Sequence, residues 1–126
     1  MILDSNIVIY ANSSTGAQLR EWTLRERRAV SEITRLEVLG YHKLDDDQKQ
    51  VLTLFIGECS ILPVTSAIID EAIRLRQIRK MDLGDAIIAA TALVHAETLA
   101  TANTADFQWI PGLTLLNPLD LLKPAP

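Results

Sequence analysis

Apolar residues of the chain gather in short continuous runs, which alternate with longer stretches where apolar positions recur at helical spacing. Short continuous runs bounded by turn residues are typical of buried strands. They predict strands at MILD, RAVS, CSILPVT, TLAT and, with the weakest pattern, LTLL. The spaced stretches predict helices over residues 5–11, 17–28, 32–44, 47–58, 67–81 and 84–97. Ser31, and either Thr65 or Ser66, stand where the N-cap of a helix is expected.

The order of these segments indicates an α/β fold. Strands that are apolar throughout, rather than at every second position, are typical of a parallel sheet covered by helices on both faces. We expect an α/β/α sandwich with a central parallel sheet of four to five strands, formed by a single domain over residues 1–126. The helix over 84–97 should be buried because it is apolar on nearly all sides, and the tail from residue 117 should lie over the surface.

The composition narrows the class of protein. Hydrophobic residues make up 48% of the chain, which is enough for a sizeable core. Cys59 is the single cysteine, so no intramolecular disulfide can form, and we expect it to be a small core residue in a reducing compartment. No targeting segment and no apolar stretch long enough to span a membrane is visible. We therefore expect a cytoplasmic protein that makes no membrane contact.

The distribution of charge says more than its sum. Taken alone, a net charge of −4 argues against a nucleic-acid partner, because phosphate contacts need Lys and Arg. Nevertheless, five of the twelve basic residues fall between residues 20 and 35, and four fall between 74 and 80. Each Arg-rich stretch can be a solvated helix face or a contact for phosphate groups.

Polar residues follow two of the predicted strands. Asp4 ends the first strand and Thr101 ends the fourth, after which the loop carries Asn103 and Asp106. In open parallel sheets, sites form outside the carboxyl ends of the strands. These side chains are therefore candidates for one common site.

Two further acids have unusual surroundings. Glu37 shares a predicted helix face with the apolar residues Ile33 and Tyr41, and Asp85 opens the apolar helix over 84–97. A carboxylate on an inward face is costly unless it is paired, hydrogen-bonded or bound to metal. We therefore expect both carboxylates to point toward the same site.

Together the acids form a candidate metal site. No Lys or Arg stands beside them in these motifs to neutralise the cluster, and oxygen ligands without His or Cys suit Mg²⁺ or Mn²⁺. The candidate ligands and catalytic residues are Asp4, Glu37, Asp85 and Asp106.

Each acid also has a simpler structural explanation. Asp85 can favour a helix N-terminus electrostatically, and Asp82 fits a helix N-cap better than a metal ligand. Asp106 can be a turn residue, and Glu37 can lie at a helix edge in solvent. Asp4 has the least convincing structural role, because so short a strand gains little by ending in an acid. The metal-site interpretation depends on the four candidate acids together.

Four segments carry a family resemblance. MILDSNIVIY, SEITRLEVLGY, LGDAIIAATAL and LATANTADFQWIPGLTLLNP resemble, in order and spacing, the motifs of PIN-domain proteins, and most closely those of VapC-type toxins of bacterial toxin–antitoxin systems. Each motif is short and weakly specific by itself. Four in this order are strongly specific, and they cover essentially the whole chain.

The resemblance implies a PIN-like fold and a Mg²⁺- or Mn²⁺-dependent endoribonuclease that cleaves structured RNA such as tRNA or ribosomal RNA. It also implies a homodimer and a cognate antitoxin. By motif position, the pocket acids are Asp4, Glu37, Asp85 and Asp106, of which Glu37 completes the shell of an ion held by the other three. The supporting polar residues are Asn6, Thr101 and Asn103.

Two positions depart from the family pattern. Ser5 stands where threonine is common, which is a conservative change. Ala102 stands where a basic residue is common, so RNA binding would depend more on the two Arg-rich stretches. The alternative function is a PIN module that mainly binds a partner or takes part in RNA processing; retention of the acids favours the nuclease. We expect Trp22 and Trp109 to be packing residues.

Overall fold

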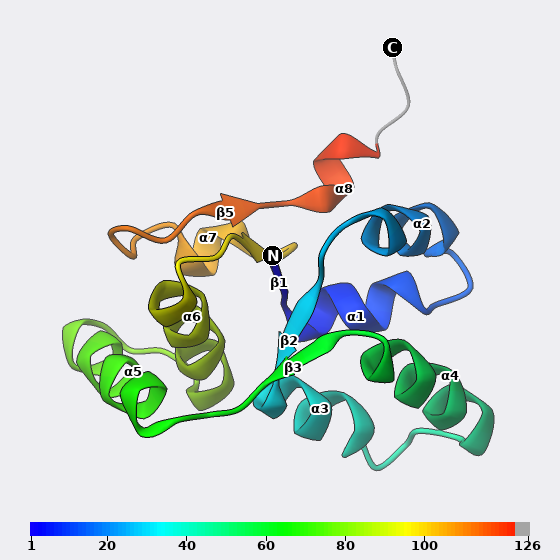
Figure 1. Cartoon of the computed structure of the whole chain (residues 1–126), viewed down its shortest axis with the longest axis horizontal. Helices are drawn as coiled ribbons and strands as arrows, with labels where there is room; N and C mark the ends of the chain where they lie inside the picture. The colour runs from blue at the N-terminus through cyan, green and yellow to red at the C-terminus, as the bar shows by residue number, and fades with distance from the viewer. Residues whose placement is uncertain (123–126) are drawn as a thin grey trace.

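The computed structural model describes residues 1–122 as alternating strands and helices around one sheet (Figure 1). The strands are β1 (Ile2–Leu3), β2 (Ala29–Ser31), β3 (Ser60–Leu62), β4 (Leu99–Ala100) and β5 (Leu115–Leu116). The helices are α1 (Ser5–Ala11), α2 (Ala17–Arg25), α3 (Glu32–Leu39), α4 (Asp46–Gly57), α5 (Ser66–Ile78), α6 (Leu83–His95), α7 (Thr104–Phe107) and α8 (Pro118–Leu121).

The sheet confirms the predicted parallel architecture. Its order is β3-β2-β1-β4-β5, and every pairing is parallel. Ile2 of β1 pairs with Ala29 on one side and with Leu99 on the other, so the first strand of the chain is central. The five predicted strands are therefore all present, with β1 beside a strand from the far end of the chain.

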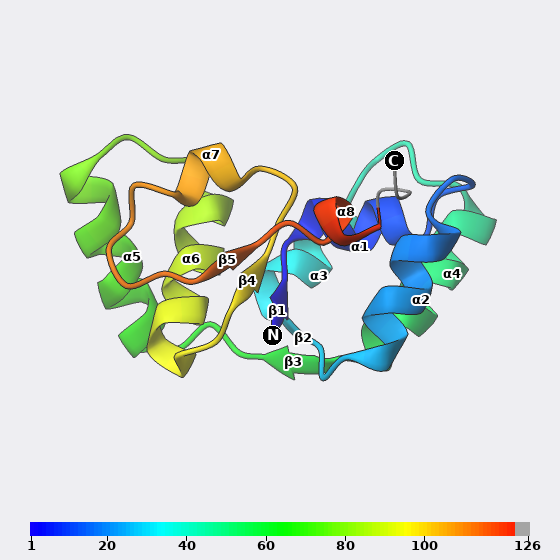
Figure 2. The same cartoon turned by 90° about the horizontal axis from the view of Figure 1, so that it is seen from above.

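Alternation along the strands divides the core into two layers. Ile2 and Leu99 pack with α5, α6 and α7 on one face of the sheet. Leu3, Val30 and Ala100, each the next residue along its strand, pack with α1, α2 and α4 on the other face. Figures 1 and 2 show these two groups of helices on opposite sides of the strands. The two-residue strands β1 and β4 thus each contribute one side chain to each layer.

Helix α6 is the central helix of its layer. Its buried side chains are mostly small, which allows the helix to lie close to its neighbours, and it makes its most extensive contact with α5. The predicted burial of this helix is confirmed. No helix within residues 1–122, α6 included, is both long and apolar enough to cross a bilayer.

Capping residues explain where helices begin and end. The Ser31 hydroxyl accepts a hydrogen bond from the Ile33 N–H, and the Thr65 hydroxyl accepts one from the Ile68 N–H, so both predicted caps are confirmed. The predicted helix over 32–44 was too long, because α3 ends at Leu39 with Gly40 as its C-cap.

The two shortest helices, α7 and α8, were not predicted. A four-residue helix is too short to show helical periodicity. The tail was expected over the surface, but Pro118 at the start of α8 is buried, and Leu119 and Leu122 pack against the layer that contains α2. Residues 123–126 of that tail lie outside the described part of the chain.

Candidate acidic active site

Asp4 lies at the carboxyl end of the central strand, where β1 passes into α1. Its side chain is only 5% exposed, and its Oδ1 accepts a hydrogen bond of 2.7 Å from the Ser5 N–H. Its Oδ2 accepts one of 2.7 Å from the hydroxyl of Thr101, which is fully buried directly after β4. The ends of two adjacent parallel strands are therefore joined by a direct bond between predicted site residues.

Glu37 reaches the same place from α3. The Ser5 hydroxyl donates to Glu37 Oε1 at 2.8 Å and lies 3.2 Å from the Thr34 hydroxyl oxygen. Gly84 of α6 lies against the same carboxylate, since a Cβ at residue 84 would stand 2.5 Å from Glu37 Oε2. However, the prediction that Glu37 faces inward is wrong, because its side chain is exposed. Contacts with α1 and α6, rather than burial, fix its position.

The other acids come from α6 and α7. Asp85 is half-buried in the first turn of α6, as predicted for a residue at a helix N-terminus. Asp82 occupies the N-cap position of α6, although its side chain makes no capping hydrogen bond. Asp106 is exposed on α7, the short helix that follows β4. Four segments far apart in the sequence thus supply the acids.

These acids lie close enough to influence one another's protonation. Burial, together with the charges of Asp4, Asp82, Asp106 and Glu37, raises the pKa of Asp85 to about 6. Burial also raises the pKa of Asp4; the hydrogen bonds from Thr101 and Ser5 oppose this, and the charges of Glu37 and Asp106 add to it. All four predicted acids therefore share one electrostatic site.

The three predicted supporting residues differ in their burial and in their hydrogen bonds to the acids. Thr101 bonds Asp4 directly, and the backbone N–H of Asn103 donates to the Thr101 hydroxyl at 3.0 Å. The Asn103 side chain is exposed and does not cap α7. The side-chain oxygen of Asn6 is buried and has no hydrogen-bond partner among residues 1–122.

The donor chemistry of this site suits a divalent cation. Within residues 1–122, none of the four acids forms an ion pair with Lys or Arg, so their mutual repulsion is not relieved by the protein. The Asn6 oxygen is an additional unpaired acceptor. In the same part of the chain, no three His, Cys, Asp or Glu side chains are arranged to hold an ion together. Joint coordination would therefore require carboxylates to turn toward one another.

Sequence reasoning missed three residues that shape the site: Ser5, Thr34 and Gly84. Ser5 and Gly84 immediately adjoin Asp4 and Asp85, and Thr34 stands one helical turn before Glu37. Their position beside the predicted acids in the sequence was therefore the feature that could have pointed to them. The sequence contains no sign that α1 and α6 both contact the end of the Glu37 side chain.

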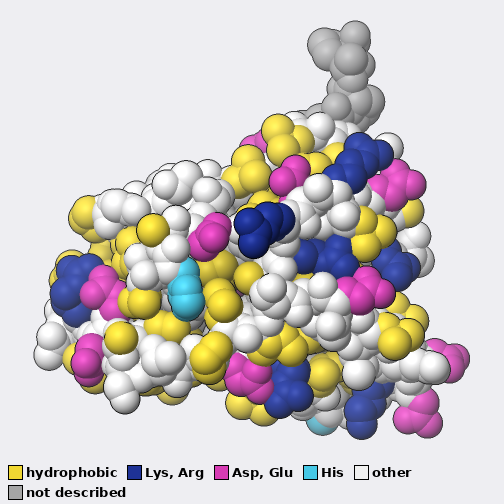
Figure 3. Space-filling view, viewed as in Figure 1, with side chains coloured by type: hydrophobic (Ala, Val, Ile, Leu, Met, Phe, Trp, Pro, Cys, Tyr) yellow, Lys and Arg dark blue, Asp and Glu magenta, His cyan; other side chains and the backbone are white. Residues whose placement is uncertain are grey.

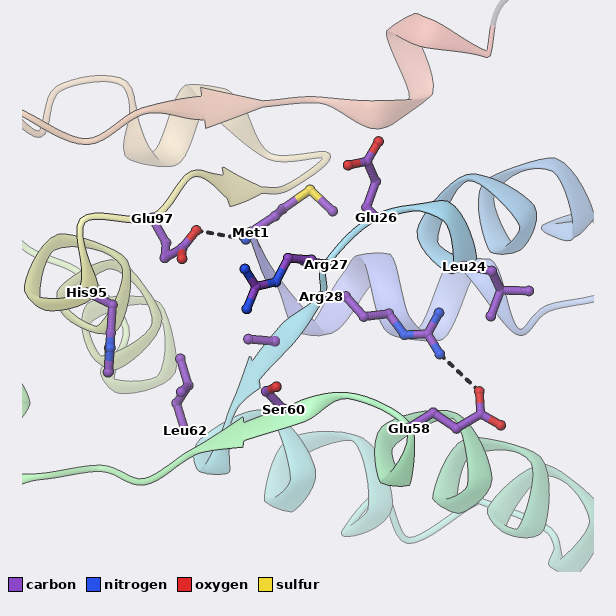
Figure 4. A pocket seen from close by; sticks show the side chains of 11 residues that line it. Met1, Leu24, Glu26, Arg27, Arg28, Glu58, Ser60, Leu62, His95 and Glu97 are labelled. Atoms are coloured by element: carbon purple, nitrogen blue, oxygen red, sulfur yellow. Dashed lines mark hydrogen bonds and ion pairs between the residues drawn. The ribbon is translucent and has the colours of Figure 1, made fainter.

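A hollow lies at the end of the sheet opposite the acids. It has a volume of about 750 Å³ and lies at the amino ends of β1, β2 and β3 (Figure 4). The Arg28 guanidinium pairs with Glu58 at 2.9 Å, and the Met1 ammonium pairs with Glu97 at 2.8 Å. Figure 3 shows acidic and basic side chains interspersed on this face. Two ion pairs therefore contribute to the lining of the hollow, whereas Arg27, which also lines it, forms no ion pair within residues 1–122.

This hollow also locates part of the first Arg-rich stretch. Arg27 and Arg28 both line it, at the end of the strands opposite Asp4. These two arginines therefore lie away from the acids, and a role for them in RNA binding stays a prediction.

A central parallel sheet with carboxylates gathered at the carboxyl end of its strands defines a class of acidic-site α/β proteins. Comparison with known families identifies the member of that class: the profile described as "PIN domain" matches residues 1–112. The chain belongs to the PIN domain family. The fold and the resemblance inferred from the sequence are both confirmed.

Individual relatives agree with this assignment. The chain is 28% identical to Ribonuclease VapC1 of Rickettsia felis over 127 aligned residues, which cover 92% of this chain and 94% of that protein. It resembles a chain of a toxin–antitoxin complex from Klebsiella pneumoniae with a TM-score of 0.77 and 33% identity, covering 93% and 96% of the two chains. A DNA-bound VapBC structure from Salmonella typhimurium has a TM-score of 0.77 and 20% identity, covering 91% and 95%, and shows the shared fold alone.

Proposed function

We propose that this protein is a VapC-type, metal-dependent endoribonuclease that acts as the toxin of a type II toxin–antitoxin module and cleaves tRNA or ribosomal RNA. The observation that carries the proposal is the electrostatic coupling of four acids at the carboxyl end of the sheet. The name of the relative from Rickettsia felis, a ribonuclease, supports the same activity.

The proposed reaction is hydrolysis of an RNA phosphodiester bond. A bound Mg²⁺ or Mn²⁺ supplies activation of water and neutralisation of phosphoryl charge in such reactions. Asp4, Asp85 and Asp106 would hold the principal ion, and Glu37 would complete its surroundings through water or a second ion. Oxygen donors from carboxylates are the ligands that these ions prefer.

The chain's own residues position these groups. The Thr101 hydroxyl fixes one oxygen of Asp4, and the Ser5 N–H fixes the other. The Ser5 hydroxyl orients Glu37, so one residue positions two acids. Hydrogen bonds of this kind hold ligating carboxylates in a defined orientation. We assign Asn6 and Asn103 to the same supporting role, since the buried side-chain oxygen of Asn6 has no hydrogen-bond partner among residues 1–122.

The proposal also includes protein partners and the extent of the domain. A homodimer and a cognate antitoxin are inferred from the family resemblance, and the similarity to a chain of a toxin–antitoxin complex also supports the antitoxin. The side chains of Leu36, Ile73 and Leu83 are 67%, 52% and 64% exposed, so apolar surface is available for partners. We assign residues 1–126 to one PIN domain, because α8 packs against α2 beyond the end of the family profile.

Replacement of single acids tests the nuclease against the alternative of a PIN module that only binds partners. Asp4→Asn and Asp85→Asn should each abolish RNA cleavage in the presence of Mn²⁺ and relieve growth arrest on induced expression. Asp70→Asn, which changes an exposed acid of α5, should leave both unchanged. Mapping of cleaved RNA ends would identify the substrate. Full cleavage by either site variant would contradict the proposed function, and growth arrest that persists without cleavage would favour the binding module.

A further inference from the structure

We propose that Arg79 and Lys80, in the loop between α5 and α6, bind the RNA backbone beside the acidic site, with Trp109 holding Arg79 in position. The inference rests on the proposed nuclease function and specifies which basic residues dock its substrate. The four cations of the second Arg-rich stretch, between residues 74 and 80, differ in whether another group of the protein binds them.

The other two arginines of this stretch are used within the fold. Arg74 is bound to Glu71 one turn earlier on α5. The Arg76 Nε–H donates to the Met81 carbonyl oxygen at 3.1 Å and so ties the end of α5 to the loop. Arg79 and Lys80 are exposed, and neither forms an ion pair within residues 1–122. These two cations are available to an external anion.

Arg79 is connected to the turn that carries one of the acids. Its guanidinium lies 5.6 Å from the centroid of the Trp109 ring. The Trp109 indole N–H donates to the backbone oxygen of Asp106 at 3.1 Å, and the half-buried ring packs against the core. Trp109 is therefore a packing residue, as predicted, and also the platform that places Arg79 near Asp106.

The loop is connected to a second acid through the chain. After Lys80 come the buried Met81 and the N-cap residue Asp82, and α6 then brings Asp85 into its first turn. Figure 2 shows this loop running along the same edge of the molecule as α7. The cations thus lie between two of the segments that build the acidic site.

The stacked geometry suits a phosphate group. A guanidinium packed on an aromatic face keeps the N–H donors in its own plane available, and those donors match phosphate oxygens. The other acid-bearing segments offer no equivalent cation. The described residues after β4 contain no Lys or Arg, and Arg35 of α3 pairs with Glu32. A polyanion that approaches the acids therefore finds its unpaired cations in this loop.

Salt-dependent RNA binding tests the inference. We would use Asp85→Asn protein, to prevent cleavage, and measure the anisotropy of a fluorescein-labelled tRNA between about 50 and 200 mM KCl. Adding Arg79→Ala and Lys80→Ala together should weaken RNA binding about 5- to 50-fold. The slope of the logarithm of the binding constant against the logarithm of the KCl concentration should become shallower by about 0.7 to 0.9 per residue replaced. Arg27→Ala, which removes one exposed cation at the opposite end of the sheet, is the control for loss of positive charge away from the acids and should change neither. Equal melting temperatures would establish that the variants are folded.

Variants of Trp109 test whether this residue acts by positioning Arg79 or by contacting RNA itself. With the acids intact, Trp109→Ala should raise KM for RNA with little change in kcat, and Trp109→Phe should restore KM because it keeps an aromatic face. Trp109→Ala should add little to a protein that already carries Arg79→Ala.

The outcomes distinguish this inference from the proposed function. RNA binding that depends on Arg79 and Lys80 without cleavage by the wild type would support the docking surface and contradict the nuclease. Cleavage by the wild type together with unchanged RNA binding in the double variant, or with no RNA binding by any Asp85→Asn protein, would overturn the docking surface. Loss of antitoxin binding with unchanged RNA binding would instead assign the loop to a protein partner and also overturn it.

Discussion

Gly84 lies so close to the Glu37 carboxylate that any side chain at residue 84 would displace it. A Cβ there would stand 2.5 Å from Glu37 Oε2, the end of an exposed and flexible side chain. Because that carboxylate can swing away, Gly84→Ala should leave the melting temperature unchanged or raise it by the equivalent of up to about 1 kcal/mol. The same movement should lower kcat/KM for RNA cleavage by about 10- to 100-fold.

Gly57→Ala provides the control for this change. It is also a helical glycine, and an added Cβ there has no heavy atom within 4 Å. It should affect stability similarly without reducing cleavage. Wild-type activity in folded Gly84→Ala would show that the position of Glu37 does not matter for catalysis.

Thr101→Val removes the hydroxyl that donates to Asp4 while keeping the side-chain shape. The buried carboxylate loses one of its two hydrogen bonds, so unfolding free energy at pH 7 should fall by about 1 to 3 kcal/mol. The pKa of Asp4, which this bond lowers, should rise further above its ordinary value. The acidic limb of the pH–activity profile should therefore move to higher pH. Denaturant titration and cleavage rates measured between pH 5 and 8 would check both effects.

Thr91→Val is the matched substitution, since Thr91 is equally buried and its hydroxyl donates only to the Ile87 carbonyl within α6. Its pH–activity profile should coincide with that of the wild type. If the pH–activity profiles of Thr101→Val and Thr91→Val moved by the same amount, general destabilisation would explain the effect.

Asp85 should make the metal-free protein less stable as pH rises. Its pKa is about 6 in the fold and 3.8 in the reference state, so the folded chain binds the proton more tightly. The resulting stabilisation is complete below pH 3.8 and is lost as pH rises through about 6. Because solvent screens this partly exposed carboxylate, Asp85→Asn should raise stability in EDTA at pH 7.5 by about 1 to 2 kcal/mol, and by less at pH 4.5. Equal gains at both pH values would contradict this origin of the effect.

Divalent metal should relieve the same repulsion. Millimolar Mg²⁺ or Mn²⁺ should raise the melting temperature, by an amount equivalent to about 2.7 kcal/mol if the ion is present at a hundred times its dissociation constant. The gain should be smaller in Asp4→Asn and Asp85→Asn, whereas Asp70→Asn should match the wild type. Differential scanning fluorimetry against EDTA measures this, and an unchanged wild-type melting temperature would argue against an ion at the acids.

Local patterns were sufficient to predict most of the fold. Continuous apolar runs gave the parallel sheet, and the hydroxyl caps Ser31 and Thr65 marked two helix starts correctly. The short helices α7 and α8 escaped prediction because each depends on anchoring by neighbouring elements, such as the buried Phe107 and Pro118, rather than on periodicity.

The candidate site could be predicted by position but not by environment. Strand ends located Asp4 and Thr101, and the structure joins them by a hydrogen bond. Glu37 was expected on an inward helix face but is exposed, because apolar neighbours on a helix do not reveal that no layer covers that face. Its contact with Gly84 depends on the spacing between α3 and α6, which only tertiary packing determines.

The strand order has a consequence for how the chain folds. The bond between Asp4 and Thr101 spans 97 residues, and β1 can pair with β4 only after that entire loop has closed. Such non-local pairing slows folding and delays the contacts that depend on it. An incompletely folded chain would therefore lack the assembled acids, so a preparation's nuclease activity would report completed folding rather than mere presence of the polypeptide.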